Sequence, residues 1–143
     1  MKEYNIQVPC IMYDIVTPCG HLYTKRLTDK LIDRFNTDKD FRNSLFCQSK
    51  TDNPQPEISY PRISAKVMNF WYASAIPNKL MTTIRILDTP EGRELDYFFT
   101  RNYKVELTPF GICNATKIEG IEIINSDSYS LCYFESLVLP KNI

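Results

Sequence analysis

Apolar and polar residues alternate over Tyr4–Tyr13, a pattern that predicts an opening strand. Pro and Gly then interrupt the chain, and the period of the pattern changes. Leu27, Leu31 and Phe35 follow at four-residue spacing, which lines up one apolar face of a helix. Thr24 stands just before this segment, where its hydroxyl can cap the free backbone N–H groups. The first third of the chain therefore predicts a strand followed by an amphipathic helix.

The middle of the chain predicts a short helix, a loop and a pair of strands. Asp38–Cys47 has the composition of a short helix, and Gln48–Pro61 is polar with three prolines, which favours a loop. Arg62–Trp71 alternates in the manner of a strand, and Lys79–Leu87 is a second apolar, β-rich run. Pro77–Asn78 between them is typical of a turn. The two runs are thus expected to form an antiparallel pair.

A helix start of unusual clarity follows in the stretch "ILDTPEGREL". Thr89 is a suitable N-cap, and Pro90 fits the first helical position, where a missing N–H removes no helical hydrogen bond. Glu91 adds a favourable negative charge in the first turn. The helix is expected to stop near Asn102. Its predicted buried face consists of Leu95, Phe98 and Phe99.

The remaining chain predicts three further strand regions: Lys104–Leu107, Gly111–Ile124 with a break at Gly120, and Tyr129–Leu139. Strands thus outnumber helices and mostly follow one another directly. The predicted fold class is α+β, a curled and mainly antiparallel sheet or barrel flanked by two helices. With 143 residues, the chain is expected to form a single domain over 1–143.

The charge balance argues against nucleic acid and membranes as partners. Seventeen Lys and Arg offset seventeen Asp and Glu, whereas a nucleic-acid binder normally carries a basic excess. The basic cluster at Lys25, Arg26 and Lys30 is interrupted by Asp29 and Asp33, as on a solvated helix face. No apolar run approaches the roughly 18 residues that would span a bilayer. A near-zero net charge does not oppose association, so a homo-oligomer is compatible with the sequence.

The cysteines predict reduced thiols rather than disulfides or a metal site. They are odd in number and scattered, and no Cys-x-x-Cys pair occurs. A single histidine, His21, is available to complete a zinc site, so no metal and no other cofactor is expected. The five positions are Cys10, Cys19, Cys47, Cys113 and Cys132.

Five segments together resemble the prohead (head maturation) proteases of tailed bacteriophages, which share the barrel-and-helix fold of the herpesvirus assemblins. "ILDTPEGREL" and the later "LTPFG" resemble the helix start of that family and the strand that ends in its nucleophilic serine. "PCGHLYTKRL" resembles the segment that enters the first helix, and "TDNPQ" stands where the family has its histidine loop. "YFESLVLP" resembles the closing strand. The resemblance covers most of the chain in the family's order.

The same resemblance implies that the catalytic residues have been replaced. The nucleophilic serine falls on Thr108, and the catalytic histidine falls on Asn53, whose amide has no basic nitrogen. The arginine of the family's turn falls on Phe110, while Gly111 is kept. Pro109 lacks the N–H that would follow the nucleophile and could serve an oxyanion. The resemblance therefore implies a protease-like fold that lacks the groups needed for catalysis.

Three other arrangements are candidate sources of activity. Glu106 is expected on the same side of its strand as Thr108, but a carboxylate acting directly on a threonine is a weak activating pair. His21 would have to reach Thr108 in space, and otherwise it is a loop residue at a helix entrance. Cys19 lies two residues from His21, but nothing nearby matches the context of a cysteine protease.

Aromatic residues make up 13% of the chain and gather in two segments, "NFWYASAIP" and "SYSLCYFESL". Aromatic side chains are enriched at protein interfaces, although they also fill sheet cores. The candidate interface residues are Trp71, Tyr72, Tyr129 and Tyr133.

These observations predict a catalytically inactive relative of the prohead proteases that acts as a structural protein of the virion. The expected role is that of an auxiliary or decoration protein bound to the major capsid protein or to other virion proteins. An active maturation endopeptidase with an atypical nucleophile is one alternative, and an assembly scaffold or chaperone is another. In either structural role the protein would be made in the host cytoplasm and would associate with the virion.

Overall fold

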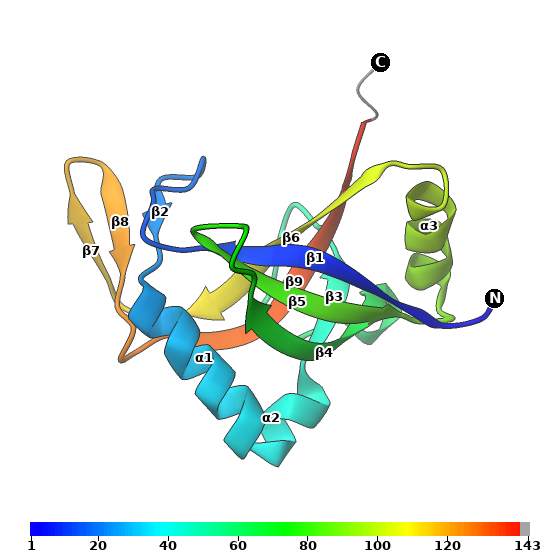
Figure 1. Cartoon of the computed structure of the whole chain (residues 1–143), viewed down its shortest axis with the longest axis horizontal. Coiled ribbons are helices and arrows are strands. Elements are labelled where there is room, and N and C mark those ends of the chain that lie inside the picture. Colours follow the sequence, from blue (N-terminus) through cyan, green and yellow to red (C-terminus); the bar gives the residue numbers. More distant parts are fainter. Residues whose placement is uncertain (141–143) are drawn as a thin grey trace.

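The computed structural model describes residues 1–140 and contains a six-stranded sheet, a three-stranded sheet and three α-helices (Figure 1). The elements in chain order are β1 (Tyr4–Met12), β2 (His21–Leu22), α1 (Lys25–Thr37), α2 (Lys39–Ser44), β3 (Phe46–Ser49), the 3₁₀ turn η1 (Tyr60–Arg62), β4 (Ile63–Tyr72), β5 (Lys79–Ile86), α3 (Pro90–Phe99), β6 (Lys104–Ile112), β7 (Ala115–Ile118), β8 (Ile121–Ile124) and β9 (Ser130–Leu139).

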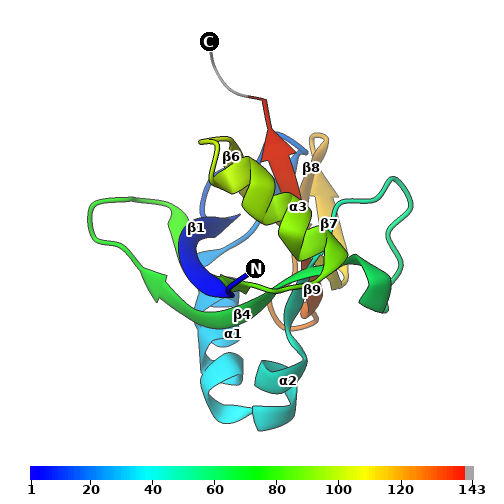
Figure 2. The ribbon, with the colours of Figure 1, turned by 90° about the vertical axis from the view of Figure 1, so that its right-hand side faces the viewer.

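The larger sheet has the order β1-β5-β4-β3-β9-β6 and is curled into a half-barrel (Figures 1 and 2). Its pairs are antiparallel except for β3 and β9, which run parallel. Helices α1 and α2 lie together along one side of the sheet, and α3 lies at the end away from the small sheet (Figure 1). The expected α+β class with a curled, mainly antiparallel sheet is confirmed; α1 and α3 are the two longer predicted helices, and α2 lies within the predicted short helix Asp38–Cys47.

Local capping explains why the two longer helices begin where they do. The Thr24 hydroxyl accepts from the Leu27 N–H at 3.3 Å, and the Thr89 hydroxyl accepts from the Gly92 N–H at 3.0 Å. Both caps were predicted from the sequence. In α3, Gly92 allows a close approach, because a Cβ there would lie 1.9 Å from the Leu87 carbonyl oxygen.

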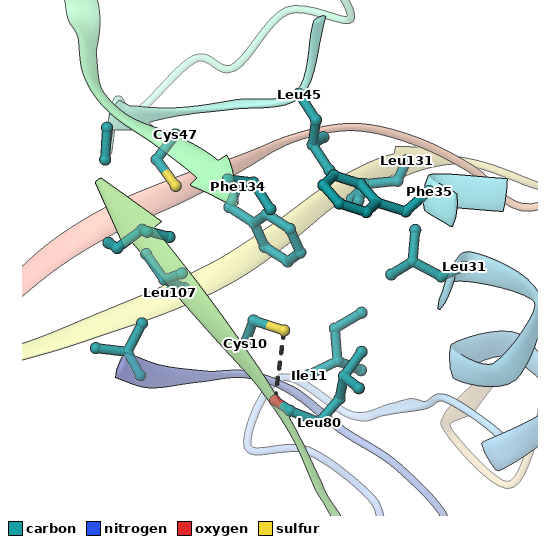
Figure 3. Close-up of a cluster of buried hydrophobic side chains, with 14 of the residues drawn as sticks. Cys10, Ile11, Leu31, Phe35, Leu45, Cys47, Leu80, Leu107, Leu131 and Phe134 are labelled. Atoms are coloured by element: carbon teal, nitrogen blue, oxygen red, sulfur yellow. Dashed lines mark hydrogen bonds between the residues drawn. The ribbon is translucent and has the colours of Figure 1, made fainter. Parts of the chain in front are cut away.

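The core fills the concave side of the half-barrel (Figure 3). Cys10, Cys47 and Phe134 enter it from three different strands, and α1 adds Leu31 and Phe35. In α3, Leu95 is buried as predicted, whereas Phe98 and Phe99 are only half-buried. The observed buried face of that helix is therefore narrower than the predicted one, because the last turn of the helix lies at the edge of the core.

Three further sequence predictions need correction. The expected loop from Gln48 begins with a strand, since β3 occupies Phe46–Ser49 between β4 and β9. The strand expected to end at Leu107 continues to Ile112, so no turn occurs at "TPFG". The region 115–124 forms β7 and β8, which pair with each other, and β8 also pairs with β2, so these strands form a separate three-stranded sheet rather than part of the main one.

Candidate functional site

Strands β6 and β9 carry the position at which the resemblance expects a nucleophile. Thr108 on β6 lies directly opposite Glu135 on β9, so both side chains project from the same face of the sheet. Glu106 projects from that face two residues earlier, opposite Leu137. Thr108 is exposed, whereas Glu135 is only 7% exposed. The face is convex, because the neighbouring residues of both strands point into the core.

Pro109 stands on the open edge of the sheet. The Lys50 N–H donates to the Ser136 carbonyl oxygen at 3.0 Å, so the main chain of Ser136 is directed toward β3. Main-chain groups alternate along a strand, so those of Glu135 face β6 and bond to Thr108. The main-chain nitrogen and carbonyl of Pro109, the next residue after Thr108, must then be directed away from β9. Since β6 is an edge strand, the missing N–H removes no ladder bond, and it leaves no donor beside Thr108 at this edge.

A loop covers β9 next to this face. The Thr51 N–H donates to Glu135 Oε2 at 3.1 Å, and the Tyr133 hydroxyl donates to the Gln55 carbonyl oxygen at 2.6 Å. Asn53 lies between these two attachments and is exposed. The fold therefore brings the segment that bears Asn53 to the face that bears Thr108, as the resemblance implies.

The chemistry available at this face is that of a carboxylate, an amide and a hydroxyl. The Glu135 carboxylate already accepts from the loop backbone, and an amide side chain at Asn53 cannot take up a proton near neutral pH. Glu106 is also on the face, with Lys104 Nζ 3.9 Å from its carboxylate. Within residues 1–140, no imidazole contacts Thr108, because the single histidine of the chain lies elsewhere.

His21 belongs to the small sheet. It pairs in register with Glu122, and its Nε2 lies 3.3 Å from the Glu122 carboxylate. Its ring meets that of Tyr23 edge-on at 6.2 Å. Cys19 is exposed and free near this sheet. These contacts give His21 a local partner, and no contact joins it to β6 or β9 in the described part of the chain.

Of the four candidate interface aromatics, Tyr133 is buried and Tyr129 is half-buried with a buried hydroxyl. Tyr133 is fully buried and stacks on Phe110 with ring centroids 5.0 Å apart. The Tyr129 hydroxyl is buried and has no hydrogen-bond partner among the described residues, and burial raises the pKa of this phenol. Tyr133 lies beneath the Thr51–Gln55 loop, to which its hydroxyl is bonded, so in this structure it offers no exposed surface, and its role in an interface stays a prediction.

Tyr72 and Trp71 occupy the end of β4. The Tyr72 hydroxyl lies 2.6 Å from the Thr28 hydroxyl and donates to Asp29 at 2.6 Å, so it fastens β4 to α1. Burial and the bond to Asp29 raise the pKa of Tyr72. Trp71 is half-buried. It keeps an accessible surface, so its role in an interface stays a prediction.

Glu135 and Tyr133 were not predicted as the residues that hold the loop. The available signal was Glu135 itself, a single carboxylate inside the apolar run "YFESLVLP". A charged residue in a buried strand needs a hydrogen-bond partner, and here the partner is the loop backbone.

The described residues contain no cluster of three or more His, Cys, Asp or Glu side chains suited to a metal ion. All five cysteines are unpaired. Among the helices of residues 1–140, none is long and apolar enough to cross a membrane.

The half-barrel with its flanking helices is the fold of a viral capsid assembly protease. In particular, the structure is similar to that of the bacteriophage T4 capsid assembly protease, gp21, with a TM-score of 0.77. The match covers 95% of this chain and 82% of that chain at 16% sequence identity. No protein-family model matches the sequence, and no curated protein matches it either. At this identity the likeness establishes a prohead-protease-like fold.

Proposed function

We propose that this protein is a catalytically inactive relative of the prohead proteases that serves as a structural component of a viral head. Its role is that of an auxiliary or decoration protein, and its partner is the major capsid protein. The similarity in fold to a capsid assembly protease supports the connection with capsids. Repeated contacts on a symmetric shell would raise the effective affinity of each copy.

The proposed loss of activity rests on the groups around Thr108, which among residues 1–140 include neither an imidazole nor an N–H from the residue that follows it. Hydrolysis by a hydroxyl nucleophile needs a base to take its proton and donors to stabilise the oxyanion. The loop over β9 offers Asn53 instead of an imidazole, and Pro109 offers no N–H beside the nucleophile position. His21 is bound to Glu122 in the other sheet.

The loop attachments support a retained structural role for the same face. Glu135 and Tyr133 hold the segment around Asn53 through two hydrogen bonds, although no catalytic pair remains for that segment to complete. A protein that retains the protease fold but lacks the catalytic residues can still bind a partner, and we propose that binding is its function. An assembly scaffold would use the same surfaces and would differ in leaving the particle before maturation.

The test combines the purified chain with unprocessed capsid precursor and with assembled shells of the same virus. We expect intact masses of both proteins to be unchanged after incubation, and we expect the chain to sediment with the shells. Precursor cleavage that Thr108→Ala abolishes would establish the active endopeptidase instead. Failure to sediment with either immature or mature shells would overturn the capsid role.

A matched pair of variants tests the candidate interface. Trp71→Ala is expected to weaken sedimentation with shells, because a half-buried tryptophan offers a large contact area. Tyr60→Ala is the control, since Tyr60 is an aromatic residue that is 77% exposed in η1. Equal behaviour of the two variants would remove Trp71 from the proposed interface.

A further inference from the structure

Strand β9 is longer than the strand beside it. Its last pair with β3 is Ser49 with Ser136, whereas β9 continues to Leu139. Over this final stretch β9 pairs with β6 along one edge, from Glu106 opposite Leu137 to Lys104 opposite Leu139. The other edge of the same stretch faces α3 instead of a strand.

The main-chain groups of Val138 are directed at this second edge. The Ser136 carbonyl oxygen accepts from the Lys50 N–H on the β3 side, at 3.0 Å. Val138 is two residues further along the strand, so its N–H and C=O point the same way. No main-chain or side-chain group within residues 1–140 bonds to them on that side. An unpaired donor and acceptor at a strand edge form a template for another strand.

A groove of about 420 Å³ lies along this edge, between β9 and α3. Leu95 and Phe98 of α3 and Val138 of β9 contribute its apolar surface. Phe98 is only half-buried in the structure, which leaves part of its ring available in the groove.

The charges around the groove favour a basic occupant. Glu91 and Glu94 line it from α3, and Lys50 is a single opposing cation. Neither glutamate has an ion-pair partner in the part of the chain that the structure describes. A basic side chain placed beside the two carboxylates would satisfy them, while an apolar neighbour would cover the accessible part of Phe98.

We propose that the Val138 edge of β9 binds an extended peptide segment of a partner protein, which adds to the sheet as a strand and carries a basic residue toward Glu91 and Glu94. Main-chain hydrogen bonds supply affinity in such β-strand addition, and alternate side chains supply specificity. An extended peptide fits better than a compact ligand, because it can pair with Val138 and reach α3 at once. This inference goes beyond the proposed function and does not depend on a capsid partner.

The experiment selects linear ten-residue peptides from a display library for binding to the full chain. The affinity of the enriched peptides, made synthetically, is then measured by fluorescence anisotropy. We expect the enriched peptides to combine apolar residues with Lys or Arg. N-methylation of the peptide residue that faces Val138 is expected to weaken binding by about tenfold, the loss that one hydrogen bond represents. Hydrogen exchange at the Val138 amide should slow in the complex.

Variants of the chain then locate the binding. Val138→Pro removes the outward N–H and leaves the bonds to β6 in place, because the residues on either side make them. This variant and Glu91→Gln/Glu94→Gln are each expected to weaken binding at least fivefold. Glu106→Gln is the control, because it neutralises a carboxylate on the convex face, and it should leave binding unchanged. Absence of enriched peptides, or equal binding to all of these variants, would overturn the proposal.

Discussion

The Tyr133 hydroxyl donates a 2.6 Å hydrogen bond to the Gln55 carbonyl oxygen, from a side chain that is fully buried. This bond ties a loop without regular structure to the strand that lies next to β6. A phenol ring can do this because its apolar body packs on Phe110 while its hydroxyl reaches the backbone.

Tyr133→Phe is expected to loosen this loop. The substitution keeps the stacked ring but leaves the Gln55 carbonyl without its donor, so the free energy of unfolding should fall by about 1 kcal/mol. Hydrogen exchange over residues 51–59 should accelerate more than exchange in the sheet. Tyr60→Phe, at an exposed position, is the control. Unchanged exchange in the loop would show that Glu135 alone holds it.

Gly111→Ala is expected to destabilise the protein by about 1–3 kcal/mol, as overpacking of a well-filled site does. A Cβ at Gly111 would lie 2.6 Å from atoms of the Tyr129 ring. The ring packs against the core and its hydroxyl end is buried, so it cannot easily move away. Chemical denaturation measures the effect. Ile112→Ala at the adjacent position, where the side chain is 55% exposed, should be nearly neutral, and equal losses would contradict the tight contact.

Leu95→Ala should lower the free energy of unfolding by about 2–5 kcal/mol, because it opens a cavity in the core. Leu95 is only 3% exposed. Phe98→Ala should have a smaller effect, since Phe98 is half-buried at the groove. Glu94→Ala, on the exposed side of α3, should be silent in urea denaturation. A loss at Glu94 as large as that at Leu95 would show that the buried face is misassigned.

Asp127 links the turn before β9 to α1, through contacts with Lys30 and Arg26. The hydrogen bond from Lys30 and the charge of Arg26 lower the pKa of Asp127 below its usual value of 3.8. Because the folded pKa lies below the unfolded one, the stabilisation is present above about pH 3.8 and is lost as pH falls through the folded pKa.

Asp127→Asn should therefore reduce thermal stability at neutral pH, and its difference from the native chain should vanish in strong acid. High salt should also shrink the difference, because the group is exposed and screened. Asp33→Asn provides the comparison on the exposed side of α1. A difference that persists in acid would assign the effect to packing.

The thiols should react in an order set by burial. Cys19 is exposed and should react first with a thiol reagent in the native protein. Burial raises the pKa of Cys47 to about 12 and also raises the pKa of Cys10, which donates to the Leu80 carbonyl oxygen (Figure 3). Both should react only after unfolding. Titration in denaturant without reductant should find five free thiols, and recovery of three or fewer would indicate a disulfide.

Part of the candidate site followed from sequence and part did not. The positions Thr108 and Asn53 came from ordered motifs and Glu106 from the alternation of its strand, and the structure brings the loop bearing Asn53 to the face bearing Thr108. The motifs suggested a turn after Leu107, but that segment is a continuous edge strand. A proline is compatible with such a strand only when its missing N–H faces outward, and the sheet order decides this.

The sequence by itself determined the helix starts at Thr24 and Thr89, the β5 strand and the α+β class. These features depend on local contacts, such as a hydroxyl that caps N–H groups within the next turn. Tertiary structure alone decided that β3 is a strand, because its parallel pairing joins Cys47 to Phe134 across the length of the domain. It also decided that Tyr133 is interior rather than a surface anchor, because burial there depends on a loop closing over β9. Pairing and burial between distant segments depend on register and chain path, which no local pattern of residues encodes.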